Sequence, residues 1–478
     1  MIETMIELLV ILLILVVISL LVYWRREDPS ITIYNDKFKQ LQMNYCIAYC
    51  LAIFADWLHG PYDYRLYSDY GYDENAIAVF YEVNFVSSSL SGTLVGHFGD
   101  KYGRKYLCAS YGVLYSLCGL FKTSSNFNFL MLGGISAGMS SAILFSTFES
   151  WYVNEHLTYQ KFPAEWMHVT FSKVSFYNGL LAIVAGVVAE YVSEILNYGP
   201  VAPYILSMPI LLLSTGYIYT NWSEHPSQEA HTENNDEIVA FSSLKFIFCK
   251  ESILLLLGMI EMFFECSMYM FVFSWTPVLS EINPPLGIIF SLFMVAFMMG
   301  TKFYEFLIHK RYKPENILMI TCILGFMCFS VVTILISPSS RNRYEDSKLP
   351  VYICGLCFFL YELSVGLYYP VMSYLRGRIV PEKYRASVAN WFRFPMNILT
   401  CLALLWGNRS GRPMVSHASK FSIIFHICSI LLLLATCISV MFGKSYANRM
   451  EDERLKMDIE AKQVATVTEI ASKQKLES

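Results

Sequence analysis

GHFGDKYGRK, residues 96–105, is a short charged stretch between two apolar runs. We expect a helix to end at its first glycine, because the two later glycines allow a tight turn. The acidic residue then faces the basic pair across that turn. Such a charge-paired loop can join one group of helices to its neighbour and release it when the groups rock against each other. The residues that would form this latch are Gly96, Asp100, Gly103, Arg104 and Lys105.

The composition places the chain in a membrane. Of its 478 residues, 55% are hydrophobic and 16% are aromatic, and the mean hydropathy is +0.43. Soluble domains rarely reach these values, so we expect an integral membrane protein. The formal net charge of −4 and the scattered basic residues argue against a nucleic-acid interface. The 13 cysteines lie mostly in apolar runs without paired metal spacing, so neither a metal nor a cofactor is expected.

Apolar windows of about 20 residues recur along the chain, which is the length at which a helix crosses a bilayer. They fall at residues 5–24, 43–60, 76–97, 106–122, 128–148, 170–192, 201–221, 252–275, 286–308, 315–336, 351–374, 387–407 and 421–442. All should be helical, because lipid offers no partner to unpaired backbone groups. The first window has acidic residues ahead of it and no cleavage site, so we expect it to remain as a span. Two small-residue pairs, Gly92 with Gly96 and Gly134 with Gly138, should permit close helix contacts.

A polar insertion, WSEHPSQEAHTENNDEIVAFSSLK at 222–245, separates the last twelve windows into six and six. Equal halves joined by a solvated linker are typical of carriers that bind substrate between the halves, near mid-membrane. We therefore expect an all-α membrane protein with two six-helix bundles and one extra N-terminal transmembrane helix. The expected parts are 1–42 (first span and cytoplasmic linker), 43–221 (N-terminal bundle), 222–250 (cytoplasmic linker), 251–443 (C-terminal bundle) and 444–478 (a charged, weakly helical cytoplasmic tail).

The distribution of Lys and Arg predicts the orientation. If the loop after the first span is cytoplasmic, the loops on that side carry most of the loop Lys and Arg residues, as cytoplasmic loops do. The N-terminus is then extracellular and the C-terminus cytoplasmic. The sequon at Asn408 falls outside, close to the membrane, whereas the sequon at Asn221 falls inside and should stay unmodified.

The opening stretch resembles the G-x-L-x-D-x-x-G-R-K/R signature of the major facilitator superfamily. Its counterpart in the second half, GTKFYEFLIHKRYK at 300–313, keeps Gly300 and a basic pair but lacks the Asp-x-x-Gly core. The resemblance implies the fold of that superfamily, two six-helix bundles around a central substrate site. The missing core weakens the case for a second latch.

Further stretches resemble the eukaryotic molybdate-anion transporters, a family within that superfamily, over residues 40–442. They are ADWLHGPYDYRLY (55–67), ILFSTFESWYVNEH (143–156), FPAEW (162–166), SWTPVL (274–279), PLGIIFS (285–291) and NWFRFP (390–395). The resemblance implies a plasma-membrane carrier that imports the molybdate anion, whose end use is the molybdenum cofactor. We expect the carrier to be a monomer.

An ionised side chain at mid-membrane costs about 2.5–3.5 kcal/mol on insertion scales, so each needs a partner, a cavity or a function. In the twelfth window, Asn390, Arg393 and Asn397 share one helical face. A guanidinium between two amides suits a tetrahedral dianion, because it offers a fork of donors with neutral donors beside it. The alternative is an internal salt bridge from the arginine to Glu265 or Glu362.

Lys173 is the second cation inside a window, with Tyr177 one turn later and Asn178 beside it. It can bind the anion, or it can extend to water from the cytoplasmic end of its span. Members of the resembled family look similar in carrying a basic residue here. Trp391 and Tyr361 are further candidates for the lining of the pocket.

Four acidic residues inside the windows or at a window's end are candidates for proton coupling or salt bridges: Asp56, Glu149, Glu265 and Glu362. A carboxylate near the binding arginine can hold its charge while the site is empty and release it when the anion arrives or the carboxylate is protonated. For Glu149, at the cytoplasmic end of its span, a gate or latch contact is the alternative.

Other functions remain open. Sulfate, phosphate or an organic anion fits the same charges, because these residues define charge better than size. A non-transporting sensor or scaffold is consistent with the incomplete loop of the second half. A membrane-embedded enzyme would need a buried histidine beside an acid or carboxamide, and His426 has none on its helix, so no enzymatic activity is expected.

Overall fold

The computed structural model describes residues 7–17, 35–224, 252–337, 347–380, 392, 395–403 and 417–477. Helices of the first half are α2 (Asp36–His59), α3 (Asp63–Asp69), α4 (Glu74–Tyr102), α5 (Arg104–Lys122), α6 (Phe127–Asn154), α7 (Met167–Glu190) and α8 (Ala202–Asn221). Those of the second half are α10 (Ser252–Leu279), α11 (Leu286–His309), α12 (Pro314–Ile336), α14 (Leu349–Ile379) and α16 (His417–Glu477). Residues 395–403 are also helical, and these ranges contain no strand.

Polar residues just ahead of the apolar runs set where several helices begin. The Asn35 side chain accepts a hydrogen bond from the backbone N–H of Phe38 at 3.1 Å, and Asp73 does the same for Ala76 at 3.1 Å. These caps satisfy N–H groups that have no partner within the helix. The helix α2 therefore starts well before the apolar window at 43–60.

The helix α4 does not end at Gly96, and this part of the prediction was wrong. It continues to Tyr102, and the chain turns at Gly103, where φ is +101°. The earlier glycines of the stretch are helical because neighbouring residues supply enough helix propensity to carry the chain through them. Only Gly103 adopts a conformation that favours glycine.

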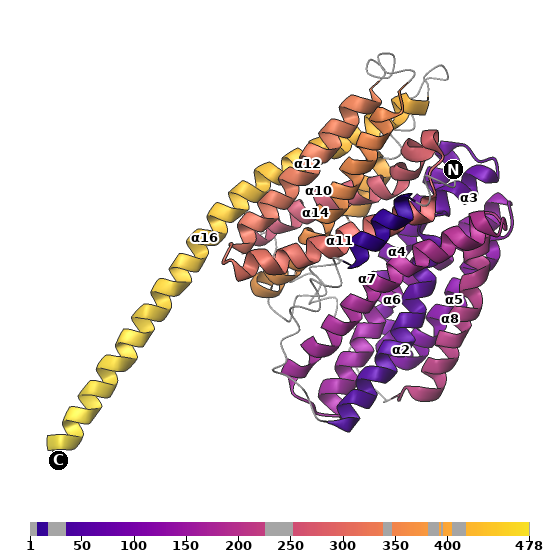
Figure 1. Cartoon of the computed structure of the whole chain (residues 1–478). Helices are drawn as coiled ribbons and strands as arrows, with labels where there is room; N and C mark the ends of the chain where they lie inside the picture. Colours follow the sequence, from indigo (N-terminus) through magenta and orange to yellow (C-terminus); the bar gives the residue numbers. More distant parts are fainter. Residues whose placement is uncertain are drawn as a thin grey trace.

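The two halves repeat one order of helix packing. In the first half α4 packs on α6, α6 on α5, α5 on α8 and α8 on α2. In the second half α11 packs on α14, α14 on α12, α12 on α16 and α16 on α10. With α7 and the helical segment 395–403 counted as the fifth helices of their halves, and the short α3 left out, both orders run second, fourth, third, sixth and first. Figure 1 shows the halves as two adjoining groups of helices, indigo to magenta and orange to yellow.

Glycine permits the closest contacts inside each half. A Cβ on Gly138 of α6 would lie 2.4 Å from the Asn84 carbonyl oxygen of α4, so this predicted contact is confirmed. The pair Gly92 and Gly96 makes no such contact with the described residues, because a Cβ at either position would meet none of their atoms within 4 Å. Glycine spacing alone does not say which face of a helix meets a neighbour.

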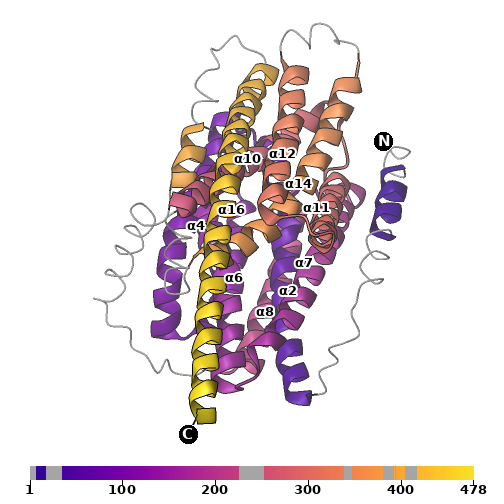
Figure 2. The ribbon, with the colours of Figure 1, turned by 90° about the vertical axis from the view of Figure 1, so that its left-hand side faces the viewer.

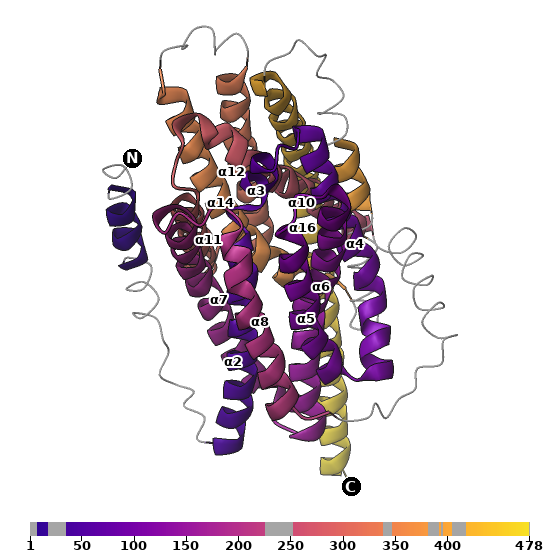
Figure 3. The ribbon, with the colours of Figure 1, turned by 90° about the vertical axis from the view of Figure 1, so that its right-hand side faces the viewer.

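Eight described helices are long and apolar enough to cross a membrane. The helices α2, α4 and α5 are long but carry more polar residues. The helix at Glu7–Val17 lies outside the bundle beside α7 and α11 (Figures 2 and 3). The helix α16 continues past Gly443 and projects from the body (Figure 1). The tail is thus helical, not weakly so, since it is rich in Ala, Glu, Lys and Gln.

A close contact between α11 and α14 gives a test of the packing. A Cβ on Gly366 would lie 2.0 Å from the carbonyl oxygen of Phe297. We expect Gly366→Ala to destabilise the protein by about 1–3 kcal/mol, the usual cost of overpacking, seen as a lower midpoint of thermal unfolding in detergent. Gly216→Ala is the control, because a Cβ there meets nothing within 4 Å. Equal midpoints for the two variants would contradict this packing.

Candidate functional site

The two halves meet along α7 and α11. A Cβ on Gly179 would lie 2.7 Å from the side chain of Met298, and one on Gly186 would lie 2.5 Å from the carbonyl oxygen of Gly287. The order of these contacts makes the two helices antiparallel. They are in contact from the middle of α7 to its last turn, on the side of the molecule where α3 lies. We call this side the α3 end, and the opposite side, which carries Gly103, the linker end.

Aromatic pairs between the halves gather toward the α3 end. Phe273 of α10 lies against Tyr64 and Tyr81 of the first half, with ring centroids 5.8 and 5.6 Å apart. Phe85 of α4 and Tyr269 of α10 are closer, at 4.5 Å. Packed rings of this kind leave little room for water. The described contacts therefore close the interface between the halves at the α3 end.

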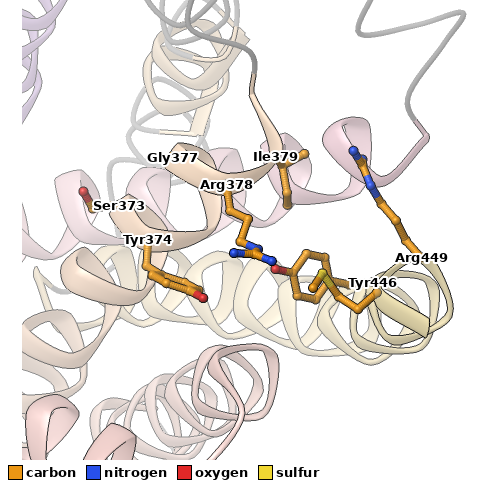
Figure 4. A pocket seen from close by; sticks show the side chains of 8 residues that line it. Ser373, Tyr374, Gly377, Arg378, Ile379, Tyr446 and Arg449 are labelled. Carbon is orange, nitrogen blue, oxygen red and sulfur yellow. The ribbon is translucent and has the colours of Figure 1, made fainter. Parts of the chain in front are cut away.

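Two open spaces among the described residues lie at the linker end. One cavity of about 340 Å³ is lined by residues that include Arg104 and Glu149. Another of about 570 Å³ lies between α14 and α16. Figure 4 shows Arg378 of α14 pointing toward Tyr446 of α16, while Arg449 points away from them. Glu149 thus lies near the signature loop, where a latch contact was the alternative prediction.

Lys173 is exposed near the start of α7. Its Nζ donates to Gln42 Oε1 of α2 at 2.8 Å, Gln42 Nε2 donates to Thr170 Oγ1 at 3.0 Å, and the Tyr152 hydroxyl donates to the same oxygen at 2.7 Å. The ammonium is held by a neutral amide, and no carboxylate pairs with it in the described part of the chain. Lys173 is therefore a positioned cation whose described partner is a neutral amide.

Asn178 and Tyr177 follow Lys173 on α7. The indole N–H of Trp57 donates to Asn178 Oδ1 at 2.7 Å, and Trp57 also contacts Phe290 of the second half, with ring centroids 5.8 Å apart. This bond fixes the orientation of the amide and leaves its Nδ2 as a donor. Tyr177 is 40% exposed. The structure thus places Asn178 beside the interface between the halves, five residues after Lys173 on α7.

The predicted residues of the twelfth window are only partly described. Asn390, Trp391 and Arg393 lie outside the described residues. Asn397 is 8% exposed on the helical segment 395–403. Within the described residues, no group of three or more His, Cys, Asp or Glu side chains is placed to hold a metal ion.

Tyr361 does not fit the prediction that it lines a pocket. It is fully buried among aromatic side chains of the second half, with its ring centroid 4.1 Å from that of Phe329 and 5.2 Å from that of Phe271. Its hydroxyl has no hydrogen-bond partner among the described residues. The sequence could not show this, because a tyrosine on a core face and one on a cavity face look alike.

The predicted carboxylates have different surroundings. Asp56 lies near Tyr115, inside the first half. Glu265 accepts one from Tyr368 at 3.3 Å and lies one turn before Tyr269, at the interface between the halves. Glu362 is 8% exposed, and no described hydrogen bond or ion pair involves it. Glu265 and Glu362 therefore remain the better candidates for proton coupling or a salt bridge at the predicted site.

One buried ion pair escaped sequence reasoning. Arg376 Nη1 lies 2.7 Å from Glu261 Oε1, with side chains 30% and 4% exposed. The predicted window ends at residue 374, before this arginine, but α14 continues to Ile379. The sequence does carry a signal for this ion pair. A basic residue lies close to the end of a predicted helix, and a carboxylate lies at a similar membrane depth in another window. Glu82 of α4 was not predicted either, and its buried Oε1 has no hydrogen-bond partner in the part of the chain that the structure describes.

The signature loop is held by an acid that sequence reasoning assigned to the solvated linker. Glu224 Oε2 accepts the backbone N–H of Lys105 at 2.8 Å, at the first turn of α5. A carboxylate there satisfies an unpaired N–H group and faces the positive end of the helix dipole. Arg104 Nη1 donates to the carbonyl of Ser150 on α6 at 3.2 Å. The side chain of Asp100, our predicted partner, is not among those described.

The start of the linker is packed instead of solvated. Trp222 is 3% exposed, and its ring stacks on Trp151 with centroids 3.7 Å apart. The indole N–H groups of these residues donate to the backbone carbonyls of Asn44 and Ser223, at 3.2 and 3.0 Å. The segment Trp222–Glu224 is therefore part of the first half. The two large residues of this segment, Trp222 and Glu224, each carry a polar group at the end of the side chain, and this could have suggested the packing from the sequence.

Comparisons with known proteins place this arrangement in a family. A family model described as sugar transporters with 12 transmembrane helices matches residues 6–355. The molybdate-anion transporter of Takifugu rubripes is 34% identical over 436 residues, covering 86% of this chain and 89% of the relative. That of Xenopus tropicalis is 36% identical over 420 residues, covering 86% and 88%.

Solved transporters share the fold. A POT family transporter, PepTSo, aligns with a TM-score of 0.67 at 9% identity, over 86% of this chain and 98% of that chain. A D-xylose–proton symporter aligns with a TM-score of 0.63 at 13% identity, over 85% and 98%. The nucleoside transporter NupG aligns with a TM-score of 0.61 at 14% identity, over 86% and 99%. All three cover both halves of the chain.

The contact between Glu224 and the loop can be tested at Gly103. A Cβ there would lie 2.7–2.9 Å from the Glu224 carboxylate, and φ is +101°. We expect Gly103→Ala to lower the free energy of unfolding by about 1–3 kcal/mol from backbone strain, plus about 1.5–3 kcal/mol from the lost hydrogen bond to a charged group. Thermal unfolding in detergent measures both.

Gly71→Ala is the matched control, since Gly71 has φ +86° but open space around it. It should show the strain alone, and Glu224→Gln should show the weakened hydrogen bond alone. If Gly103→Ala and Gly71→Ala lose equal stability and Glu224→Gln loses none, the carboxylate does not hold the loop.

Proposed function

The chain belongs to the molybdate-anion transporters of the major facilitator superfamily, and from this premise we propose that it imports molybdate across the plasma membrane by alternating access. The observation that carries the proposal is the match to relatives of that name at 34% and 36% identity over 86% of the chain. The chain is thus a multi-pass membrane transporter. Its substrate is taken from the relatives' names, so transport of molybdate is the property to test.

We further propose twelve core transmembrane helices and one extra N-terminal helix. The repeated order of packing supports two six-helix bundles, at 43–221 and 251–443, joined by the linker 222–250. The segments 1–42 and 444–478 are the proposed first span with its cytoplasmic linker and the cytoplasmic tail. The carrier is proposed to act as a monomer, because each chain has both halves of an alternating-access unit.

The linker end is proposed to face the cytoplasm, with the N-terminus outside and the C-terminus inside. Basic residues near the linker end, such as Lys105 and Arg378, support this orientation. The structure then has its outer side closed by the α7–α11 contact and the aromatic pairs. It corresponds to an inward-facing state, from which bound anion can leave to the cytoplasm.

The proposed anion site combines Lys173, Tyr177 and Asn178 of α7 with residues of the twelfth window. Lys173 supplies a positive charge, and Asn178 supplies a fixed amide donor next to the second half. Arg393, Asn390, Asn397 and Trp391 are proposed to complete the site from the other half, on the basis of the sequence alone. When the halves close, a cation from each half would contact the same dianion. Bound substrate would therefore favour closure, because a cation from one half alone would leave part of the dianion's charge uncompensated.

Carboxylates are proposed to hold the cations between transport events. Glu265, at the interface, and Glu362, a buried acid without a described partner, lie in the same half as Arg393. An anion that arrives, or a proton that neutralises the acid, would free the guanidinium. Asp56, inside the first half, is a weaker candidate for this role, and Glu149 is proposed as a latch partner of Arg104.

Uptake of radiolabelled molybdate by cells tests the proposal. Wild type should accumulate the label above untransfected cells. Arg393→Gln should lose about tenfold or more of the uptake, because a hydrogen bond to a charged group contributes about 1.5–3 kcal/mol. Lys173→Gln should lose less, since its ammonium is also held by Gln42.

The control is Lys444→Gln, an exposed lysine of α16, which removes the same charge away from the site. Surface biotinylation corrects uptake for expression. Competition with unlabelled sulfate, phosphate and a hexose asks whether the site prefers another substrate. If cells accumulate a competitor but not molybdate, that competitor replaces molybdate as the proposed substrate. If the protein binds molybdate but cells do not accumulate it, a sensor is indicated.

A further inference from the structure

Glu190, in the last turn of α7, is a carboxylate that the proposed anion site does not use. It is 4% exposed and lies within a membrane-spanning helix. Its Oε2 accepts the Tyr62 hydroxyl at 2.9 Å and the backbone N–H of Gly287 at 2.8 Å. Tyr62 belongs to the same half, just after α2, and Gly287 belongs to the second half. One oxygen atom therefore joins three segments across the interface.

The partner in the second half is the start of a long helix. Gly287 is in the first turn of α11, which runs from Leu286 to His309. The first N–H groups of a helix have no partner within it and form the positive end of its dipole. A carboxylate at this position makes a charge-assisted hydrogen bond that is shielded from water. The contact can form only while the halves are closed at the α3 end.

The backbones of α7 and α11 approach closely enough for this contact because both carry glycine where they cross. A Cβ on Gly287 would lie 2.2 Å from the carbonyl oxygen of Gly186 and 2.9 Å from Glu190 Cβ. The Ser291 hydroxyl adds a bond across the crossing, to the carbonyl of Ile183 at 2.8 Å. The crossing thus has two polar contacts between the halves, and only the one at Glu190 involves an ionisable group.

We propose that Glu190 is the latch of the outer gate: its hydrogen bond to the α11 N-terminus stabilises the inward-facing state and must break before the site opens to the outside. Glu190 is a positioning residue that does not touch the anion. The inference rests on the proposed function for its direction, because outside and inside follow the proposed orientation. The strength of this one contact then sets the balance between the two states of the carrier.

Weakening this contact would shift that balance toward the outward-facing state. Loss of a hydrogen bond to a charged group changes an equilibrium by about tenfold or more. A larger outward-facing population lowers the external substrate concentration needed for half-maximal uptake, because the apparent affinity scales with the competent fraction. Damage to the fold alone would not improve apparent affinity.

Hydrogen–deuterium exchange of the full chain in lipid nanodiscs, without substrate, tests the latch directly. The variants are Glu190→Gln, which keeps the shape and removes the charge, and Tyr62→Phe, which removes one donor. Glu194→Gln is the matched control, since Glu194 is exposed one turn later and makes no described hydrogen bond. Glu190→Gln should raise exchange at Leu286–Phe290 and lower it at Met167–Lys173, as the outer side opens and the inner side closes.

Tyr62→Phe should show the same pair of changes at smaller size, which keeps the test valid if Glu190→Gln folds poorly. Glu194→Gln should match wild type. Faster exchange at the α11 start alone would mean local fraying, and it would overturn the proposal, as would no change at either end.

Molybdate uptake by the same variants separates the latch from the substrate. Glu190→Gln should lower the external KM by about tenfold or more, while Glu194→Gln should leave it unchanged. A raised or unchanged KM in a transporting Glu190→Gln variant would overturn the latch. If no variant and no wild type carries molybdate but the paired exchange changes occur, the latch stands and the substrate assignment fails.

Discussion

The rest of the structure depends on the cost of placing charge among apolar helices. Within the described residues, two buried charges have an ion-pair partner: Lys122 pairs with Asp63, which also accepts the Tyr204 hydroxyl, and Glu261 pairs with Arg376. Such pairs stabilise one arrangement of a bundle and have no freedom to bind anything else. Lys173 differs, because its described partner is a neutral amide. The proposed anion site is therefore a place where a positive side chain is not paired with a carboxylate of the described residues.

The two ends of α7 connect Lys173 to the movement of the two halves. At one end of α7 an exposed lysine is held to α2 of its own half, and at the other end the helix lies against α11 of the opposite half. Asn178, between them, is oriented by Trp57, which itself touches Phe290. A rotation of the halves that separates α7 from α11 must also disturb Trp57 and the amide it orients. Opening of the outer side and the shape of the proposed site are therefore mechanically linked through one helix.

Much of the fold could be predicted from the sequence because lipid leaves few options for the backbone. Apolar length predicted most of the described helices, and the division of the chain at the polar insertion stays a prediction. The failures were local and have a common cause. Helix ends depend on caps and on propensity that hydropathy does not measure, so α4 runs through Gly96 and α14 includes Arg376. The partners of charges depend on which helix faces meet, and the sequence alone could not show that Tyr361 faces a core or that Glu224 returns to the signature loop. For Arg393 the chemistry of the residue types remains the whole argument.

Two carboxylates, Glu224 and Glu190, satisfy the start of a helix from another segment, at opposite ends of the molecule. The first holds the N-terminus of α5 within one half, and the second holds the N-terminus of α11 across the two halves. The same chemistry has different consequences, since a contact inside a half is kept when the halves rotate, whereas a contact between them must be broken. A carrier of this kind needs contacts of the first sort to be strong and contacts of the second sort to be strong only in one state. A single carboxylate on a helix N-terminus meets the second requirement, because its strength falls steeply once water reaches the gap.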